Sequence, residues 1–194
     1  MYILGDIGNS ETKIFLIYSN GKVFKRINFL SKDINNKNLS IKLKKINKYF
    51  SKIEKILFCS VVPKKFFLIK RYFKKKTLTK CFEIKDLNLR SLIKINVNFN
   101  QVGSDRLTNA ISLINNRDNF IILDFGTATT FDVVIKKSYM GGVIAPGVKI
   151  SLDTLIDKAS LIPRIDLKKI GNIVGNNTLS SVRSGFFWGY IGLI

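Results

Sequence analysis

The sequence predicts an α/β fold built from two related lobes, and three observations support this prediction. Segments with the hydrophobic pattern of strands alternate in blocks with segments that have the pattern of helices. A strand–acid–turn–strand unit at residues 6–17 recurs at residues 124–135. The chain has 194 residues, of which 46% are hydrophobic, and this is enough to bury a substantial core.

The first half of the chain is expected to form four strands and two helices. The pair Asn20-Gly21 indicates a tight hairpin turn between two alternating segments. Leu39, Leu43 and Ile46 recur at helical spacing, with lysines on the opposite face. The expected strands are residues 2–8, 12–19, 22–30 and 53–62, and the expected helices are residues 39–50 and a segment opened by Pro63.

The second half begins with an irregular region at residues 82–100 that should contain one short strand. The next helix should have Ser104 or Asp105 near its N-terminus, and the last helix should have Thr178 as its N-cap. The expected helices are residues 104–116, a segment starting at 146–147, and residues 178–194. The expected strands are a buried one at residues 119–125 and two at residues 129–135 and 139–145, which are joined by a turn at residues 136–138.

The chain is strongly basic, with a formal net charge of +20 and an isoelectric point near 10.1. Such a balance is typical of proteins that bind nucleic acid or anionic membranes. Here the lysines are spread through residues 22–85, and the densest run, residues 70–76, is typical of a solvated helix end. We therefore expect neither a nucleic-acid nor a membrane partner, and a basic nucleic-acid binder is the weakest of the functions considered.

The two cysteines and the absence of histidine limit the chemistry. Cys59 and Cys81 lie in apolar segments and are expected to be reduced core residues. No signal peptide is apparent, and the longest apolar run, residues 185–194, is too short to span a bilayer, so a cytoplasmic protein is expected. Without histidine, a general base must be a carboxylate, a lysine or another group, and histidine metal sites are excluded.

The recurring unit indicates an internal duplication. Asp124 lies 118 positions after Asp6, and Gly126 lies 118 positions after Gly8. Each copy ends a strand, turns, and enters another strand. We therefore expect two lobes, residues 1–117 and residues 118–194, whose matching turns face one cleft.

The two turns have the composition of a phosphate site. Glycine allows close approach of a ligand to the backbone, and the small hydroxyl and amide residues that follow offer hydrogen-bond donors. The aspartate beside each turn could hold a cation that binds the phosphates. The simpler interpretation is two ordinary hairpins with Asx-type turns. The recurrence of the unit favours the first interpretation, in which the two turns bind the phosphates of a nucleotide.

Between the turns lies the segment Val102-Gly103-Ser104-Asp105-Arg106. Asp105 could cap the following helix, or it could accept the proton of a substrate hydroxyl while Arg106 holds an anionic group of the substrate. Together with two phosphate turns, this segment favours a kinase. The glycine clusters at residues 141–147 and 175–178 are compatible equally with turns and with ligand contacts.

Five motifs give the sequence a more specific resemblance. It resembles the type III pantothenate kinases, in the superfamily of acetate kinase, sugar kinases and actin. The motifs are "DIGNSETK", "VGSDR", "DFGTATTFDVV", "GGVIAPGV" and "GNNTLSSVRSG", which occur in the family's order over nearly the whole chain. The resemblance implies two duplicated ribonuclease H-like, actin-like lobes with mixed sheets flanked by helices, the second lobe being incomplete.

The resemblance also implies ATP-dependent phosphorylation of pantothenate to 4′-phosphopantothenate, the first step towards coenzyme A. It implies ATP with Mg²⁺, a monovalent cation (K⁺ or NH₄⁺) and a homodimer. It assigns the catalytic base to Asp105. The other implied site residues are Asp6, Gly8, Asn9, Ser10, Thr12, Lys13 and Thr127 for the nucleotide, Gly103, Ser104, Asp105, Arg106 and Thr178 for pantothenate, and Asp6 and Asp124 for metal.

The sequence also departs from the family pattern. Phe99 replaces a proline six positions before the base, and Asn96 replaces an aromatic residue nine positions before it. Family members generally continue for several tens of residues beyond the equivalent of Ile194, in a part that helps to hold adenine. The alternative function is therefore a truncated, catalytically weak relative that acts as a binding or regulatory protein.

Overall fold

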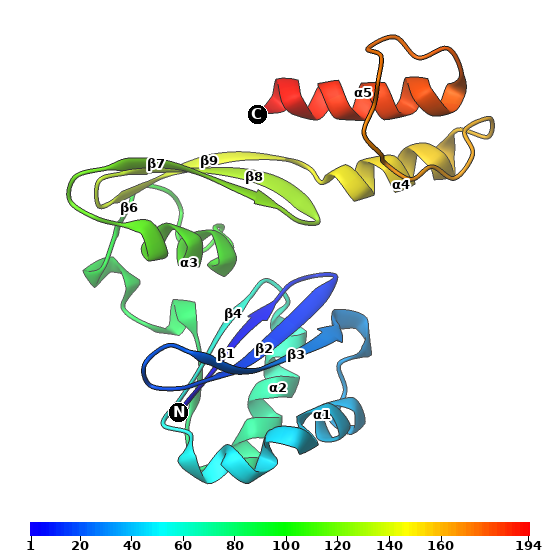
Figure 1. Cartoon of the computed structure of the whole chain (residues 1–194). Helices are drawn as coiled ribbons and strands as arrows, with labels where there is room; N and C mark the ends of the chain where they lie inside the picture. The colour runs from blue at the N-terminus through cyan, green and yellow to red at the C-terminus, as the bar shows by residue number, and fades with distance from the viewer. The chain divides into compact units, whose positions relative to one another are not determined.

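The computed structural model describes residues 1–194, and its contacts divide the chain into two units (Figure 1). The first unit comprises Met1–Ile122 and Asp132–Gly141, and the second comprises Leu123–Phe131 and Gly142–Ile194. The lobe boundary expected between residues 117 and 118 stays a prediction.

The first unit contains a five-stranded mixed sheet with the order β3-β2-β1-β4-β5. Strand β1 pairs antiparallel with β2 and parallel with β4, so that Asp6 lies between Lys13 and Cys59. Gly21 has a φ of 83°, which confirms the tight turn expected between β2 and β3. The strands are β1 Tyr2–Ile7, β2 Glu11–Ile17, β3 Val23–Leu30, β4 Lys55–Ser60 and β5 Cys81–Glu83.

Three helical segments pack with this sheet. The single helix expected at residues 39–50 is divided into α1, Asn36–Leu43, and a 3₁₀ segment, Lys44–Lys52. Helix α2, Pro63–Lys76, begins at the expected proline and runs along the sheet (Figure 1). The core between them is apolar and aromatic, and its fully buried members include Ile3, Leu39, Phe58, Ile69 and Phe73.

The irregular region ends in α3, Ser104–Leu113. Before it lie two short 3₁₀ turns, Ile84–Asp86 and Leu89–Ser91, and the short strand β6, Lys94–Ile95, as expected for this region. The N-cap of α3 is Gly103, and no side chain caps it. Buried Leu107 and Ala110 of α3 pack in a second apolar cluster with Val134 and Tyr139.

The second sheet has the order β6-β9-β8-β7. The other three strands are β7, Asn119–Phe125, β8, Ala128–Ile135, and β9, Ser138–Pro146, all close to their expected bounds. The expectation that residues 119–125 are buried is wrong, because β7 is an edge strand on which Ile121 is 67% exposed. The mixed α/β class is confirmed.

The second unit ends in two helices, α4, Val148–Lys158, and α5, Thr178–Leu193. The N-cap of α5 is Asn177, whose side chain accepts a hydrogen bond from the Ser180 backbone N–H. The expectation that Thr178 is the N-cap is therefore wrong by one residue: the capping box uses the preceding asparagine and Ser180. No helix of the structure combines the length and the apolar character needed to cross a membrane.

Candidate active site

The first predicted phosphate turn connects β1 to β2, and hydrogen bonds from the core side fix its backbone. The Gly8 N–H donates to the Glu11 carbonyl at 3.0 Å. The Ser31 hydroxyl donates to the Gly8 carbonyl at 2.6 Å, and the Ser31 N–H donates to the Ser10 carbonyl at 2.9 Å. Asn9 and Ser10 are exposed at the tip. The turn is thus fixed on its core side and open on the other.

The residues predicted to bind a ligand at this turn lie on opposite faces of the sheet, because alternate residues of a strand point to opposite sides. Asp6 and Lys13 pair on one face, whereas Thr12 pairs with buried Ile7 on the core face. The Thr12 hydroxyl is fully buried, 2.8 Å from the Ser31 hydroxyl, so it supports the turn from within. Its predicted contact with the nucleotide stays a prediction, as do those of Asp6 and Lys13.

The predicted base, Asp105, lies in the first turn of α3. Its Oδ1 accepts a hydrogen bond from the Arg106 N–H at 2.8 Å. A Cβ atom placed on Gly103 would lie only 2.3 Å from this Oδ1. The absence of a side chain at Gly103 therefore permits the orientation of the Asp105 carboxylate.

A reciprocal pair of hydrogen bonds attaches the start of α3 to the end of β4. The Ser104 hydroxyl donates to the Ser60 carbonyl at 2.7 Å and accepts from the Ser60 N–H at 3.0 Å. Ser104 is only 2% exposed. Its hydroxyl thus holds the position of the neighbouring Asp105, and the predicted contact of Ser104 with pantothenate stays a prediction.

Cys59, one residue before this attachment, lies near two predicted site carboxylates, those of Asp6 and of the predicted base Asp105. It pairs with Asp6 in the sheet. The pKa of the Cys59 thiol is raised to about 12, chiefly by burial and to a smaller extent by the charges of Asp6 and Asp105, against hydrogen bonds with Thr108 and Ser104 that lower it. The structure therefore brings Asp6 and Asp105 to the same end of β4, next to a neutral thiol.

Arg106 makes the most extensive charged contact of the first unit. Its Nε donates to Oδ1 of Asp132 at 2.7 Å, and its Nη2 lies 2.6 Å from the same oxygen, as an ionic contact without the direction of a hydrogen bond. The Tyr139 hydroxyl also donates to this oxygen, at 2.6 Å. Desolvation lowers the pKa of Arg106, but the hydrogen bond and the charge of Asp132 outweigh it and raise the pKa overall.

Asp132, Tyr139 and the supporting serines Ser31 and Ser60 are not among the site residues predicted from the sequence. Asp132 is fully buried on β8, between Phe131 and Val133. An acid inside an otherwise apolar strand was the available signal, because a buried charge needs a partner. No comparable signal marked Ser31 or Ser60, whose roles depend on backbone contacts.

The second predicted turn belongs to the second unit. The Gly126 N–H donates to the Ala128 carbonyl at 2.9 Å, which resembles the bond of Gly8 in the first turn. The Gly147 N–H donates to the Thr127 carbonyl at 3.1 Å, and a Cβ atom on Gly147 would lie 2.3 Å from the Gly126 carbonyl oxygen. Asp124 is exposed near the end of β7. That both turns face one cleft stays a prediction.

Thr178, a predicted pantothenate contact, is the first residue of α5 and is exposed. Close packing precedes it, since a Cβ atom on Gly175 would lie 2.3 Å from the Ser181 backbone nitrogen. The "GNNT" segment thus includes a glycine required by the backbone and an asparagine cap. The contact of Thr178 with substrate stays a prediction.

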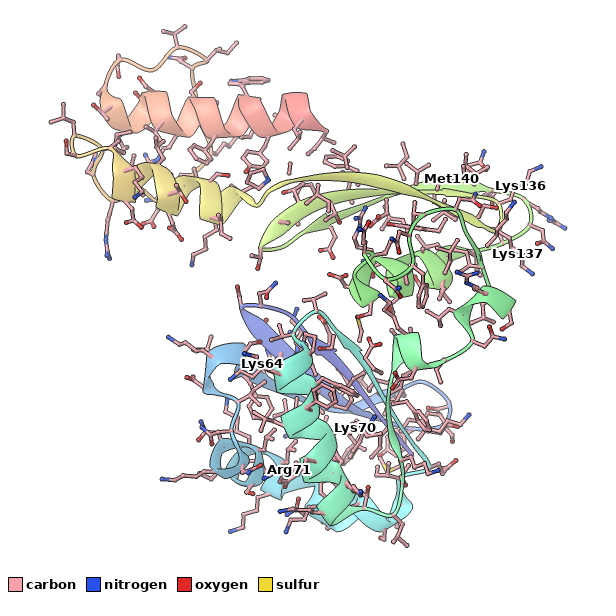
Figure 2. All side chains as sticks on the ribbon, turned by 180° about the vertical axis from the view of Figure 1, so that it is seen from behind. Lys64, Lys70, Arg71, Lys136, Lys137 and Met140 are labelled. Carbon is pink, nitrogen blue, oxygen red and sulfur yellow. The ribbon has the colours of Figure 1, made fainter.

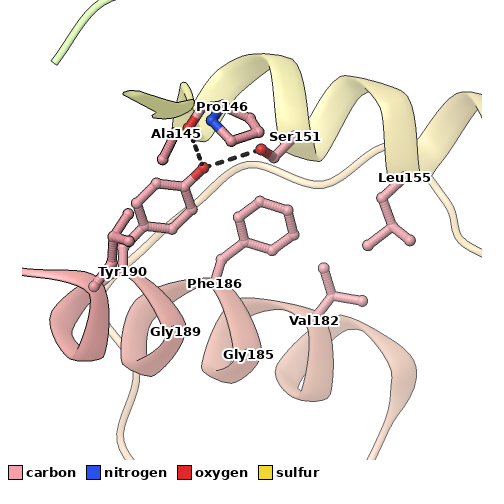
Figure 3. A pocket seen from close by; sticks show the side chains of 10 residues that line it. Ala145, Pro146, Ser151, Leu155, Val182, Gly185, Phe186, Gly189 and Tyr190 are labelled. Carbon is pink, nitrogen blue, oxygen red and sulfur yellow. Dashed lines mark hydrogen bonds between the residues drawn. The ribbon is translucent and has the colours of Figure 1, made fainter. Parts of the chain in front are cut away.

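A cavity in the second unit contains none of the predicted site residues. It has a volume of about 450 Å³ and lies between α4 and α5, lined by apolar residues such as Leu155, Val182 and Phe186 (Figure 3). At one end the Tyr190 hydroxyl donates to the Pro146 carbonyl and lies 3.0 Å from the Ser151 hydroxyl. Both polar groups at that end are therefore paired within the protein.

No group of three or more histidine, cysteine, aspartate or glutamate side chains is placed to bind a metal together. This arrangement is compatible with Mg²⁺ delivered with a nucleotide, because that ion commonly binds through one or two carboxylates, phosphates and water. Asp6 offers one such carboxylate beside the first turn.

Comparison with known proteins identifies the family. The sequence model of the type III pantothenate kinases matches residues 2–194. A type III pantothenate kinase of Pelagibacter ubique is 63% identical over 194 residues, which is 100% of this chain and 78% of that protein. The chain belongs to the type III pantothenate kinase family. The resemblance drawn from the five motifs is thereby confirmed, and the alternative of a catalytically weak binding protein is not favoured.

Solved structures support the fold of this family member. A Baf family protein of Campylobacter jejuni matches 98% of the chain, and the chain covers 76% of that structure, with a TM-score of 0.55 and 17% identity. A Sinorhizobium meliloti protein described as a 2-dehydro-3-deoxygalactonokinase matches 91% of the chain, with 64% of that structure covered, a TM-score of 0.51 and 9% identity. The ribonuclease H-like, actin-like fold class is thus confirmed.

Several exposed basic side chains of this family member lie outside the predicted site. Figure 2 marks exposed Lys64 and Arg71 on α2, and exposed Lys136 and Lys137 at the turn between β8 and β9. None of these four residues was assigned to nucleotide or substrate. The expected absence of a nucleic-acid partner stays a prediction.

Proposed function

We propose that the chain is an ATP-dependent kinase that phosphorylates the primary alcohol of pantothenate and forms 4′-phosphopantothenate, the first step of coenzyme A biosynthesis. One observation carries the chemical part of this proposal. The start of α3 is fixed to β4 by the Ser104–Ser60 pair, which holds Asp105 close to the end of β4, where Asp6 of the neighbouring strand β1 pairs with Cys59. A phosphoryl transfer needs a base and a phosphate-binding element in such proximity.

Asp105 would accept the proton of the pantothenate alcohol as its oxygen attacks the γ-phosphorus of ATP. The Arg106 N–H bond orients the Asp105 carboxylate before substrate binds. The Arg106 guanidinium stays charged and would attract the carboxylate of pantothenate. Gly103, Ser104 and Thr178 complete the proposed substrate contacts.

The first turn would bind the phosphates of ATP through the backbone N–H groups of Asn9 and Ser10, with Gly8 allowing close approach and Lys13 adding positive charge. Thr12 would act from inside the turn, and Thr127 would make a further phosphate contact. Mg²⁺ would neutralise phosphate charge when bound at Asp6. We also propose that Asp124 binds K⁺ or NH₄⁺, which stimulation of turnover by either ion would test.

We further propose a cytoplasmic homodimer. Two free cysteines, Cys59 and Cys81, are compatible with a reducing compartment. Helix α5 carries exposed Phe187, Trp188 and Ile191 and would contribute apolar surface to the association. Sedimentation equilibrium should give twice the 22.1 kDa mass of the chain, and the mass of one chain at micromolar concentration would contradict a stable dimer.

The activity is tested by incubating the purified chain with ATP, Mg²⁺, K⁺ and pantothenate and following ADP release. Mass spectrometry should detect 4′-phosphopantothenate in amounts equal to the ADP formed. Omission of pantothenate should abolish ADP release. ATP binding by calorimetry without product formation would instead support the binding-protein alternative and contradict the proposal.

A further inference from the structure

The buried carboxylate of Asp132 makes its polar contacts through only one of its two oxygens. Its Oδ1 receives the Arg106 Nε–H and the Tyr139 O–H, and also contacts Nη2 of Arg106. Its Oδ2 is equally buried and has no hydrogen-bond partner. Asp132 and Tyr139 are both fully buried, and the exposed fraction of the Arg106 side chain is 14%.

Stability alone does not explain this arrangement. Desolvation of a buried ion pair costs as much as the attraction returns in many proteins, and apolar replacements of such pairs are often neutral or stabilising. The surroundings here are apolar, since Leu107, Ala110 and Val134 belong to the same core cluster. The arrangement does, however, fix the position of the Arg106 guanidinium, because its Nε and Nη2 both lie close to Oδ1 of Asp132.

We propose that Asp132 and Tyr139 are positioning residues that hold the Arg106 guanidinium ready for the carboxylate of the acceptor substrate. This inference rests on the proposed function. Nε of Arg106 donates to Asp132 and Nη2 lies in ionic contact with the same oxygen, which leaves Nη1 outside this contact for the substrate anion. Tyr139, whose O–H donates to the shared oxygen, fixes the Asp132 carboxylate in turn.

The position of Arg106 also ties substrate recognition to catalysis. Arg106 follows the predicted base directly in α3, and its N–H holds the Asp105 carboxylate. Anchoring the guanidinium to β8 through Asp132 therefore fixes the acceptor's anionic end relative to the base. Loss of the contact between Asp132 and Arg106 should therefore weaken binding of the substrate's carboxylate far more than binding of ATP.

The test compares two acceptors, pantothenate and pantothenol, in which a neutral alcohol replaces the carboxylate. In Asp132→Asn, we expect the KM for pantothenate to rise about tenfold, as for loss of a hydrogen bond to a charged group, while the KM for ATP changes less than about twofold. Turnover of pantothenol, which has no carboxylate for Arg106, should be nearly unchanged. The preference for pantothenate over pantothenol should therefore largely disappear.

Tyr139→Phe gives a second measurement if Asp132→Asn folds poorly, because it removes one hydrogen bond and little volume. It should lower the same preference by about threefold, as for a typical single hydrogen bond. Asp118→Asn, at an exposed position, is the matched control for loss of one carboxylate charge and should leave the preference unchanged.

Equal losses with both acceptors, together with a lower melting temperature, would show that the cluster is only structural and would overturn the inference. An unchanged preference in both variants would overturn it as well. If the unaltered chain phosphorylates neither acceptor, the proposed function itself fails, and the inference fails with it. Activity of the unaltered chain therefore distinguishes the two failures.

Discussion

At the scale of single residues, several hydroxyls assigned to ligands from the sequence are bonded within the protein. Thr12 and Ser104 lie in two of the motifs, but Thr12 faces the core and Ser104 is bonded to the Ser60 backbone. For Thr12 the reason is geometric: alternate residues of a strand face opposite sides, so a motif does not reveal which of its polar groups faces a ligand. Ser104 lies in the first turn of α3 and instead bonds with the backbone at the end of β4. Sequence reasoning identifies the segment more reliably than the contact.

The first prediction concerns Gly103. In Gly103→Ala the new Cβ would lie 2.3 Å from Oδ1 of Asp105, so the carboxylate must rotate away. Because φ at Gly103 is −61°, the backbone tolerates alanine, and the melting temperature should change little. We expect kcat to fall by up to about 100-fold, as for a misplaced catalytic group.

The control for this substitution is Gly171→Ala, where nothing lies within 4 Å of the added Cβ. Steady-state kinetics of both variants provide the measurement. Unchanged kcat in Gly103→Ala would show that the orientation of Asp105 does not limit the reaction.

The second prediction concerns the two thiols. Burial raises the pKa of Cys59 and of Cys81 from 9.0 to about 12. Between these pH values the unfolded thiols release protons that the folded thiols retain, so the free energy of unfolding should fall as pH rises. Urea unfolding from about pH 8 to about pH 10 measures this slope, since free thiols titrate there.

The double variant with Cys59→Ala and Cys81→Ala is the comparison. It should show a smaller decrease of stability over the same pH range, whatever its stability at neutral pH. An identical slope in the variant and the unaltered chain would mean that other groups account for the whole effect.

At the scale of elements, the sequence predicted the bounds of most strands and helices better than it predicted their burial and capping. Strand β7 occupies the expected residues but lies at a sheet edge, with Ile121 and Phe125 exposed. An apolar run indicates a strand but does not indicate its place in the sheet, where β7 pairs with β8 alone and β8 pairs in turn with β9. The cap of α5 was misplaced by one residue because Asn177 and Thr178 are both good capping residues.

The third prediction concerns the contact between the second turn and the start of α4. In Gly147→Ala, the added Cβ would lie 2.3 Å from the Gly126 carbonyl oxygen and 2.5 Å from that of Thr127. Since backbone atoms cannot rotate away, the turn must shift. We expect a lower melting temperature and a higher KM for ATP, measured by calorimetry and kinetics.

Gly171→Ala is again the control, because it adds the same methyl group in open space. A Gly147→Ala variant with unchanged melting temperature and unchanged KM for ATP would contradict the proposed coupling between this contact and the nucleotide site.

At the scale of the whole molecule, the alternation of strands and helices predicted the α/β class, the duplicated unit predicted two related lobes, and the five motifs predicted the family. The two copies form similar strand–turn–strand units, β1–β2 and β7–β8, but their turns differ in detail: Gly8 bonds to Glu11, whereas Gly126 bonds to Ala128. Asp132, which anchors Arg106, has no counterpart in the first copy, where Ile14 occupies the aligned position. A repeat therefore predicts the shared scaffold and misses contacts that only one copy makes.

The central claim, that Asp105 is the base of a pantothenate kinase, is tested most directly by Asp105→Asn. Asparagine has nearly the same shape and cannot accept the proton, so melting temperature and pantothenate affinity should be almost unchanged. The rate of 4′-phosphopantothenate formation should fall roughly 10²–10⁴-fold, the usual contribution of a general base. A variant that forms product at the rate of the unaltered chain would contradict the claim.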